Sequence, residues 1–470
     1  MRIDVLPDEV LVTIFDYYVA PYQSIKPEVE KRISLVHVCR RWRAVVFGSP
    51  RRLNLRLFCS PRTPARDTLD VWPSLPLIID DDASLASNED DMVFALGHND
   101  RIHKVSLCVA GFQGESVLTA LQVPFPKATH LQLAVPPHGQ VLPAVPDSFL
   151  GGSAPCMRYF SLTGIRFPGL SKFLLSTTHL VNLHLHIHRF GYIPPEAMVT
   201  CLSGLTSLKR FTLKFQFFHS YRESQRSTLA PYSVLSSLID IEFEGSSGYL
   251  EDLVANVDAP QLKFFFVTFG LQPNLSIPQL NKFISRTPAL KAPVEVHAVF
   301  ERLLARVELI PQTPGLGGFH VQIPSEAPDW QLSCLMQVLQ VLASSSCPVF
   351  MVENLYIEDQ GSEFTTTSQV EVTQWWDFLR PFVAVKNIYL FKKIAVDVAC
   401  SLEALGEGRS MEVLPALQNI FLTPPEVVPP LTLSLVQERI EQFVAVRYLL
   451  GHSITITVSN GEGSPRRVVD

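Results

Sequence analysis

The chain has 470 residues, of which 47% are hydrophobic and 18% are charged, so it carries enough apolar material for a large core and too little charge for a disordered chain. Its formal net charge of −6 argues against a general nucleic-acid binder, which needs a strong basic surplus. Its 8 cysteines include no CxxC pair and are spread along the chain, so we expect reduced thiols and no disulfide framework.

Targeting signals are not evident in the sequence. No stretch reaches the roughly 18 uninterrupted apolar residues that a membrane helix needs. The acidic start of the chain also lacks the apolar core of a signal peptide. We therefore expect a cytoplasmic or nuclear protein, or one found in both compartments, that does not bind membranes.

The first fifty residues predict two amphipathic helices. Pro7 fits the first turn of a helix, and Asp8 and Glu9 follow at the positive end of the helix dipole. An apolar stripe continues from there at helical spacing: Val10, Leu11, Ile14, Phe15 and Tyr18. After a loop at Pro21–Pro27, a second helix is predicted for about residues 31–47.

Over roughly residues 3–53 these elements resemble the F-box. The matching residues follow the order of that family, an LPxE helix start with an apolar IF pair and then a VCxxW helix: Leu6-Pro7-Asp8-Glu9, Ile14-Phe15 and Val38-Cys39-Arg40-Arg41-Trp42. The resemblance implies that residues 1–55 form a small helical bundle, the F-box domain, that packs against a Skp-type adaptor and through it reaches cullin and RING subunits. The loop between the two helices is longer than is usual in the family.

The same resemblance implies which side chains bind the adaptor: Leu6, Pro7, Glu9, Val10, Ile14, Phe15, Leu35, Val36, Cys39 and Trp42. A bundle this short cannot bury all of its apolar side chains alone. Among them, Leu6, Pro7, Ile14 and Phe15 are expected in the partner-facing patch. Leu35 and Trp42 are expected to hold the bundle together. The alternative is a generic helical cap on the segment that follows.

Residues 56–100 are expected to connect the bundle to the next domain or to cap that domain. Leu53–Leu57 alternates like a strand, and Leu75–Ile79 is a short apolar run. The run ends in Asp80-Asp81-Asp82, where a metal site is conceivable. Contiguous acids without a fixed ligand spacing are more typical of a solvated loop, so we expect no metal there.

A six-residue frame, apolar-x-x-apolar-x-apolar, recurs between residues 101 and 458. Its copies are Ile102/Val105/Leu107, Ala128/Leu131/Leu133, Met157/Phe160/Leu162, Leu180/Leu183/Leu185, Leu208/Phe211/Leu213, Leu238/Ile241/Phe243, Leu262/Phe265/Val267, a degraded Val294/Val296, Leu316/Phe319/Val321, Val352/Leu355/Ile357, Val385/Ile388/Leu390 and Leu417/Ile420/Leu422. Helical stretches are predicted between them at Ser116–Leu121, Pro195–Leu205, Tyr249–Val257, Trp330–Ala343, Val372–Phe382 and Val436–Leu450.

This pattern resembles the irregular leucine-rich repeats that follow F-boxes, whose period is about 20–29 residues. Each unit is a short strand plus a helix, and neighbouring units stack because one unit cannot cover its own apolar face. The predicted fold is therefore an all-α bundle followed by an α/β solenoid, with parallel strands on the concave side and helices outside. Ser453–Val458 is expected to be a final capping strand, and residues 459–470 a flexible tail.

The sequence also resembles the large F-box families of mushroom-forming fungi. This resemblance rests on three short segments: Leu150-Gly151-Gly152-Ser153-Ala154-Pro155, Phe283-Ile284-Ser285-Arg286-Thr287-Pro288 and Glu441-Gln442-Phe443-Val444-Ala445. They point to a lineage and not to a binding target.

Strand side chains alternate, so the residue between the last two apolar positions of the frame points away from the core. Those positions hold Gln132, Ser161, His184, Thr212, Glu242, Phe266, Glu295, His320, Tyr356, Tyr389 and Phe421. Exposed aromatic side chains are strong anchors for protein partners. The candidates for target binding are His184, Glu242, Tyr356, Tyr389 and Phe421. Loops or the tail covering these positions is the alternative.

Catalytic and metal-binding patterns are weak in this sequence. His184, His186 and His188 share one strand face and are conceivable zinc ligands, but no carboxylate or thiolate nearby in sequence completes a tetrahedral site. There is no GxSxG elbow, Walker loop or HExxH motif, and Gly315-Leu316-Gly317-Gly318 is typical of a turn. We therefore expect a non-catalytic protein without a cofactor.

Three functions remain open at this stage. The first is the substrate receptor of a Skp–cullin–F-box ubiquitin ligase, which would raise the effective concentration of target lysines near a charged conjugating enzyme. The second is a repeat-based interaction scaffold whose F-box acts outside a ligase. The third, a hydrolase hidden in the repeats, has the weakest support.

Overall fold

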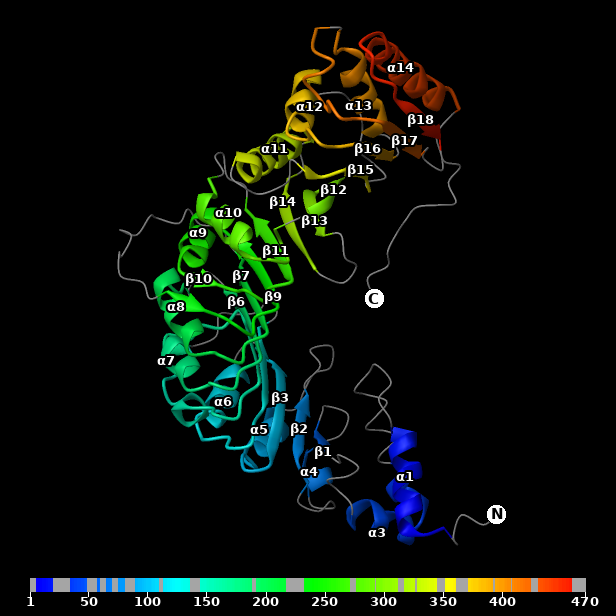
Figure 1. Cartoon of the computed structure of the whole chain (residues 1–470). Coiled ribbons are helices and arrows are strands. Elements are labelled where there is room, and N and C mark those ends of the chain that lie inside the picture. The colour runs from blue at the N-terminus through cyan, green and yellow to red at the C-terminus, as the bar shows by residue number, and fades with distance from the viewer. Residues whose placement is uncertain are drawn as a thin grey trace. The chain divides into compact units, whose positions relative to one another are not determined.

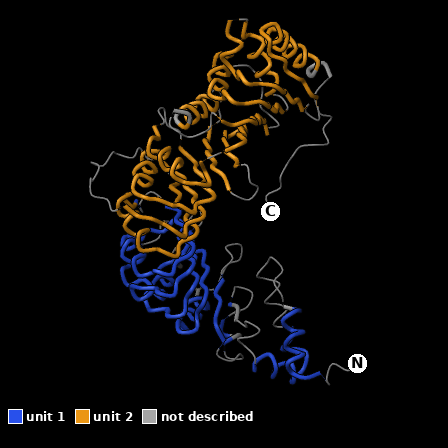
Figure 2. Tube along the Cα trace, viewed as in Figure 1, with its two compact units in different colours: residues 1–192 blue, residues 193–470 orange. Residues whose placement is uncertain are grey.

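The structure is a computed structural model of the whole chain. It describes residues 6–19, 34–48, 57–59, 65–69, 75–80, 89–109, 113–135, 144–187, 192–216, 232–270, 276–291, 293–311, 317–325, 328–344, 351–360, 371–391, 394–406, 408–423 and 430–458. The chain divides into two compact units, Met1–Tyr192 and Ile193–Asp470 (Figure 2). Several predicted features lie outside the described residues: the Pro21–Pro27 loop, Asp81, Asp82, His188, Leu316 and the tail at 459–470.

The first unit begins with helices and continues as an all-parallel sheet. Its elements are α1 (Asp8–Val19), α3 (Arg40–Gly48), β1 (Leu57–Cys59), α4 (Ala65–Leu69), β2 (Leu77–Asp80), α5 (Glu89–Leu96), β3 (Ile102–Cys108), α6 (Gln113–Ala120), β4 (His130–Ala134), the 3-10 segment η2 (Phe149–Gly152), β5 (Tyr159–Thr163), α7 (Leu170–Leu175) and β6 (Asn182–Ile187) (Figure 1). The strands lie in sequence order from β1 to β6, so the segment 56–100 contributes two strands to this sheet.

The second unit contains a longer sheet and larger helices. Its elements are α8 (Pro195–Ser203), β7 (Arg210–Phe215), β8 (Ser233–Val234), β9 (Asp240–Gly245), α9 (Ser247–Ala255), β10 (Val257–Asp258), β11 (Phe264–Phe269), α10 (Pro278–Arg286), β12 (Pro293–Phe300), β13 (Leu304–Pro311), β14 (Gly318–Pro324), α11 (Pro328–Ser344), β15 (Asn354–Asp359), α12 (Val372–Leu379), β16 (Asn387–Phe391), α13 (Ile394–Glu403), β17 (Asn419–Thr423), α14 (Pro430–Leu449) and β18 (Thr455–Val458). The strand order is β7-β9-β11-β14-β13-β12-β15-β16-β17-β18, and β8 pairs with β10 separately.

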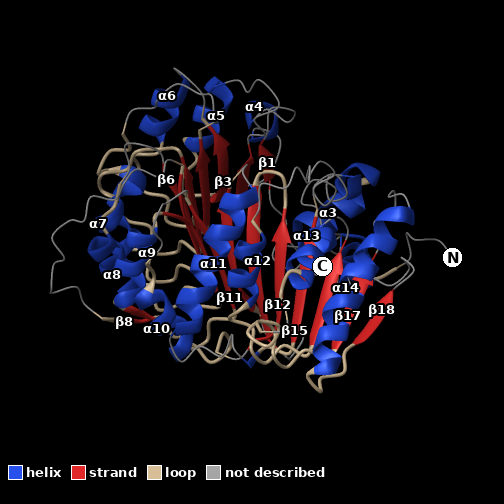
Figure 3. Cartoon of the chain, turned by 90° about the horizontal axis from the view of Figure 1, so that it is seen from above, coloured by secondary structure: helices blue, strands red, loops and turns tan. Residues whose placement is uncertain are grey.

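Strands and helices form two layers in each unit. Along β15, for example, Leu355 and Ile357 are fully buried, whereas the alternating Asn354, Tyr356 and Glu358 are only half-buried. The helices lie on the side of the apolar strand residues, as α11 to α14 do against β12 to β18 in Figure 3. The opposite side, which no described helix covers, is called the helix-free face below. The predicted fold class, helices followed by a leucine-rich-repeat-like parallel α/β array, is confirmed.

Most strands are entered through the same tight turn. In this turn the backbone amide of the fourth residue donates a hydrogen bond to the carbonyl of the first residue. The Leu262 amide, for example, donates to the Ala259 carbonyl at 3.1 Å. Proline occupies the second position of this turn in five copies, where its fixed φ favours a type I turn: Pro126, Pro155, Pro260, Pro288 and Pro415. These turns account for five of the 36 prolines of the chain, and each of the five precedes a strand.

An antiparallel insertion interrupts the parallel array in the second unit. β12, β13 and β14 form a meander in which β13 runs antiparallel to both neighbours. β14 pairs in parallel with β11, and β12 pairs in parallel with β15. No described helix separates these three strands in the sequence, so the strand–helix repeat predicted for this region is wrong here.

The insertion also corrects the predicted strand frame. The degraded copy at Val294/Val296 placed Glu295 in the row of Tyr356, but Val296 lies opposite Leu355 and His297 lies opposite Tyr356. The predicted frame was placed two residues too far toward the N-terminus. Val294 and Val296 have the spacing of the last two apolar positions of the frame, but the residues that are buried at those positions are Val296 and Ala298. Glu295 therefore lies on the same face, beside Asn354.

Gly317 permits the turn that leads into β14. Its φ is +84°, and a Cβ there would lie 1.9 Å from the carbonyl oxygen of Lys263. Gly318 donates its amide to that same carbonyl at 2.9 Å, so the backbone passes very close to the entry of β11. Any side chain at 317 would push these two strand entries apart.

We therefore expect Gly317→Ala to destabilise the second unit by about 1–3 kcal/mol, through strain at a positive φ and a clash with backbone. The measurement is the thermal unfolding midpoint of the full chain. Gly406→Ala is the matched control, because a Cβ at Gly406 meets nothing within 4 Å. Equal midpoints for the two variants would contradict this account of the turn.

Candidate functional site

The first candidate surface is an exposed apolar stripe on α1. Val10, Ile14 and Tyr17 lie on one side of the helix with 41%, 45% and 85% of their surface exposed, and Tyr18 lies next to them at 48%. The opposite side of α1 is buried against the other N-terminal helices. Apolar side chains that stay exposed on a short bundle indicate a protein interface.

The buried side of this bundle is organised by two aromatic rings. Phe15 is fully buried, and its ring centroid lies 4.7 Å from that of Trp42. Phe15 was expected in the partner-facing patch, and the structure places it in the core because it shares the inner side of α1 with Leu11. Leu35 is buried, and Trp42 is half-buried with its ring against Phe15.

The predicted second helix is divided at Cys39. Residues 34–38 are helical, and α3 starts afresh at Arg40. The Sγ atom of Cys39 accepts a hydrogen bond from the amide of Trp42 at 3.4 Å, as a helix-capping side chain does. Arg41 links α3 to the start of α1 through Asp8 at 2.8 Å and the carbonyl of Leu6.

The residues predicted to bind the adaptor therefore separate by exposure. Pro7, Glu9, Val10, Ile14 and Cys39 are exposed. Leu6 and Trp42 are half-buried, while Phe15, Leu35 and Val36 are buried. A partner can reach the exposed group directly, so the buried group supports the surface from behind. Tyr17, the most exposed apolar residue of α1, was not among the predicted contacts.

The second candidate surface is a row of stacked rings on the helix-free face of the second unit. Tyr356, Tyr389 and Phe421 lie opposite one another on β15, β16 and β17. The Tyr356 and Tyr389 centroids are 4.2 Å apart with a 6° interplanar angle, and those of Tyr389 and Phe421 are 4.5 Å apart with 8°. His297 on β12 extends the row, 4.2 Å from Tyr356. The predicted alignment of the three aromatic residues is confirmed.

A second row of side chains runs beside the rings. Asn387 donates its Nδ2 hydrogen to Oδ1 of Asn354 at 2.8 Å, and Asn419 donates to Oδ1 of Asn387 at 2.8 Å. Each strand thus repeats the phrase N-[LI]-[YF]-[IL], as in Asn354-Leu355-Tyr356-Ile357. The six-residue frame overlooked these asparagines because it considered apolar positions and one outward residue only. The repeated tetrapeptide is the sequence signal that would have found them.

The stacking determines which atoms this surface offers. Because the rings lie face to face, each interior ring covers the faces of its neighbours and presents its edge and its hydroxyl. Burial, the nearby Glu295 carboxylate and a hydrogen bond with Tyr389 raise the pKa of Tyr356 well above its usual range. The Tyr356 phenol is therefore neutral at pH 7. The row offers hydroxyl and amide groups that suit polypeptide hydrogen bonding.

Charged groups occupy the same face where the antiparallel insertion lies. Glu308 on β13 lies opposite His297 on one side and His320 on the other. Burial alone would raise the pKa of Glu308. The hydrogen bond and the charge of His320, together with the charge of Arg306, outweigh burial and lower this pKa. Burial lowers the pKa of His297 despite the opposing effect of Glu308 and Glu295. The carboxylate is thus ionised and the His297 imidazole neutral at pH 7.

The remaining predicted target-binding residues lie on helix-free faces but apart from the stacked rings. Glu242 on β9 is paired with Lys214 and accepts a hydrogen bond from Thr212 at 3.3 Å, so it is part of a local polar network. His184 belongs to the first unit, where its ring lies 5.2 Å from that of Tyr159. His186 shares its strand face, two residues on.

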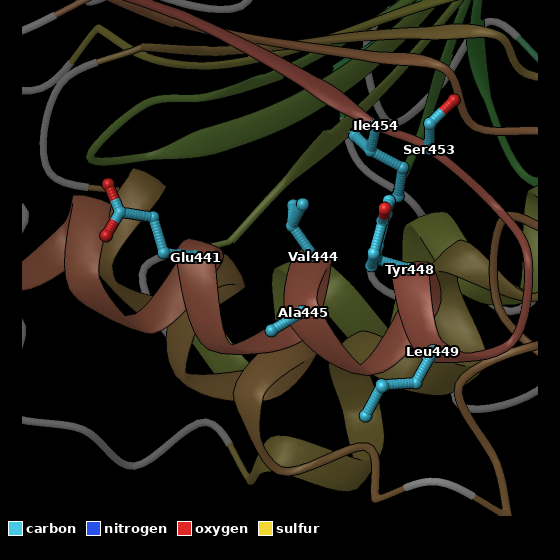
Figure 4. A pocket seen from close by; sticks show the side chains of 7 residues that line it. All are labelled: Glu441, Val444, Ala445, Tyr448, Leu449, Ser453 and Ile454. Atoms are coloured by element: carbon cyan, nitrogen blue, oxygen red, sulfur yellow. The ribbon is translucent and has the colours of Figure 1, made fainter.

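The second unit also has a surface hollow. A hollow of about 580 Å³ lies between α14 and β18, lined by Glu441, Val444, Ala445, Tyr448, Leu449, Ser453 and Ile454. In Figure 4, Glu441 and Ser453 lie at opposite ends of this hollow, so its walls do not combine a nucleophile with a base. No group of three or more His, Cys, Asp or Glu side chains within the described residues is arranged to hold a metal. No helix described by the structure is both long and apolar enough to cross a membrane.

Comparisons with known proteins support the N-terminal resemblance. The F-box-like family model matches residues 3–55. No curated protein matches the sequence. Among solved structures, the chain is similar at 12% identity to the leucine-rich repeat-containing protein LegL7 from Legionella pneumophila, with a TM-score of 0.26 over 73% of this chain and 90% of that one. It is also similar at 12% identity to a chain of the Rad7 and Elc1 complex from yeast, with a TM-score of 0.30 over 90% of this chain and 91% of that one.

The stacked row predicts an order of destabilisation among its members. Tyr389 has a stacked ring on each side, whereas Phe421 stacks on Tyr389 on one side and faces Thr457 of β18 on the other. Because a stacked aromatic pair contributes about 0.5–1.5 kcal/mol, Tyr389→Ala should cost more free energy of unfolding than Phe421→Ala. A double-mutant cycle between positions 356 and 389, followed by urea unfolding, measures the coupling directly. A coupling energy of zero would show that the rings contribute only their buried area.

Proposed function

We propose that this chain is the substrate-recognition subunit of a Skp–cullin–F-box ubiquitin ligase. The F-box-like segment at residues 3–55 would bind a Skp-type adaptor, and through it cullin and RING subunits. The repeat array would bind the target protein on its helix-free face. The observation that carries the first half is the exposed stripe of Val10, Ile14 and Tyr17 on a segment that matches the F-box-like model.

The apolar stripe supports adaptor binding for a thermodynamic reason. A bundle of this size cannot bury all of its apolar side chains alone, so Val10, Ile14 and Tyr17 remain in water until a partner covers them. Burial of apolar surface provides about 25 cal/mol per Å². The packing of Phe15 on Trp42 beneath the stripe keeps α1 in place. The stripe is therefore already formed before a partner binds.

The stacked rings and the asparagine row support target binding. Tyr356, Tyr389 and Phe421 lie on one strand face with their apolar neighbours Leu355, Ile388 and Ile420 buried on the other. Tyrosine is enriched at interface hot spots because it buries a large area and loses little conformational entropy. In this role the chain needs no chemistry of its own, and we propose that it is not an enzyme and uses no cofactor.

Two finer parts of the proposal concern where the protein occurs. The three short segments noted in the sequence suggest a mushroom-type fungal F-box lineage. A receptor of this kind would act in the cytoplasm, the nucleus or both, where adaptor and cullin subunits are found. Antibody staining of the endogenous protein tests the second statement.

The adaptor interface is tested by replacing exposed residues of α1 in the full chain. We expect Val10→Gln together with Ile14→Gln to reduce adaptor recovery at least about tenfold, because both side chains lie on the exposed stripe and glutamine keeps helix propensity. Asp16→Gln, at an exposed position on the flank of α1, is the control. Co-purification with a Skp protein is the measurement, and unchanged recovery by the double variant would reject the proposed interface.

The target surface is tested by removing the rings. We expect Tyr356→Ser, Tyr389→Ser and Phe421→Ser together to leave adaptor binding intact and to weaken capture of target proteins, each ring contributing on the order of 1–2 kcal/mol. Proximity labelling in cells with the wild type and the triple variant provides the comparison. Identical labelling of proteins other than ligase subunits would place target recognition elsewhere.

A repeat-based scaffold that acts outside a ligase is the second candidate function. For a scaffold, we expect the α1 double variant to lose the adaptor and the ring triple variant to lose target proteins, as for a ligase receptor. Cullin and RING subunits, however, would not be recovered with the wild type. Mass spectrometry of the purified complex separates the two functions. Recovery of the adaptor without a cullin, across growth conditions, would favour the scaffold.

A further inference from the structure

Two carboxylates flank the His297–Tyr356 ring pair on the helix-free face. Glu295 lies two residues before His297 on β12, opposite Asn354. Glu358 lies two residues after Tyr356 on β15, opposite Val299. Both act electrostatically on His297, and Glu295 also acts on Tyr356, so the four side chains form one local cluster.

Neither carboxylate has a cationic partner among the described residues. The basic group nearest to Glu295 is His297, with 3.6 Å between the ring Nε2 and the carboxylate, and its imidazole is neutral at pH 7 because burial lowers its pKa. Glu358 makes no ion pair or hydrogen bond to another described side chain. Exposed carboxylates are common, but these two are half-buried beside aromatic rings, where their charge is less screened by water.

The neighbouring guanidinium does not compensate them. Arg306 on β13 forms ion pairs with Glu308 at 2.8 Å and with Glu301 at 3.3 Å, so its positive charge compensates those two carboxylates. Around the ring pair there are thus four carboxylates and one guanidinium, with His320 on the far side of Glu308. The cluster carries an excess of negative charge at pH 7.

We propose that this part of the helix-free face binds a lysine or arginine side chain carried by an extended segment of the target protein. The proposal rests on the proposed function, since it names the chemistry of the segment that the receptor captures. The cationic group lies between Glu295 and Glu358, over the edges of His297 and Tyr356. The segment's main chain lies along Asn354, Asn387 and Asn419, whose amides have hydrogen-bonding capacity beyond the bonds they exchange.

Charge complementarity selects this occupant over others. An acidic or phosphorylated segment would bring further negative charge against Glu295, Glu308 and Glu358. A neutral segment would bury the two unpaired carboxylates without compensation, which costs free energy. A lysine or arginine both supplies the missing cation and lays its aliphatic stem against the ring edges.

The probes are three fluorescein-labelled nine-residue peptides. They alternate serine with lysine, with arginine or with acetyl-lysine, so that the last removes the charge and keeps the shape. Fluorescence anisotropy with the purified full chain in complex with its adaptor should show the two cationic peptides binding at least about fivefold tighter than the acetylated one, a ratio that corresponds to ~1 kcal/mol. A nonspecific attraction to the net negative chain would give the same preference, so variants are needed.

The variant Glu295→Gln with Glu358→Gln should lose most of the preference for the cationic peptides. Glu412→Gln with Glu438→Gln removes the same charge from exposed positions of the second unit outside the strands and should keep it. An unchanged thermal midpoint shows that each variant is folded. An equal preference in both double variants, or no preference in the wild type, overturns the proposal.

Failure of this inference is distinguishable from failure of the proposed function. If the ring variant loses its targets in cells while Glu295→Gln with Glu358→Gln keeps them, the face binds targets but does not select a cation. If no variant changes target capture, the face itself is not the receptor surface.

Discussion

Neighbouring strands of the repeat array are held in register by the side chains that they bury. A single strand–helix unit cannot cover its own apolar face, so Leu355, Ile388 and Ile420 become buried only when their strands lie level with one another. A slip of one residue would turn these side chains outward, at a cost of several kcal/mol for each strand. The same register brings Tyr356 against Tyr389 and Asn354 against Asn387. The chemistry of the helix-free face is therefore a consequence of core packing on the other side.

The sequence predicted the parts of this fold that depend on strong periodicity. The alternation at Ile102 to Leu107 or Val385 to Leu390 is sufficient to locate strands, and amphipathic stretches locate α8, α9, α11, α12 and α14. The six-residue helix α7 was not identified, because it gives few turns over which an apolar stripe can repeat. The nine-residue helix α10 was not identified either, although it is as long as α8 and α9. The recurring proline turns are a further signal that a search by hydrophobicity alone passes over.

Two errors in the candidate sites have the same physical origin. At Pro293–Phe300 several apolar residues fit more than one frame, and only pairing with β15 decides which of them is buried. On α1, Ile14 and Phe15 are adjacent in the motif, but they lie about 100° apart around the helix, so one is exposed and the other buried. In both cases tertiary contacts decide between local alternatives that the sequence leaves nearly equal. The asparagine row was missed for a different reason, since its signal is a repeated polar residue.

The antiparallel insertion changes the chemistry of the helix-free face of the second unit. Strands β15, β16 and β17 present phenols, a phenyl ring and amides, whereas β12 and β13 present Glu295, Glu308 and Arg306 on the same face. In this insertion, Glu308 lies between His297 and His320 on the helix-free face. A polar, partly charged surface of this kind differs from the apolar stripe on α1. An apolar stripe suits a partner that remains bound. A half-buried polar and aromatic face suits a partner that is captured and released, because desolvating the charged and amide groups of that face offsets much of the binding free energy.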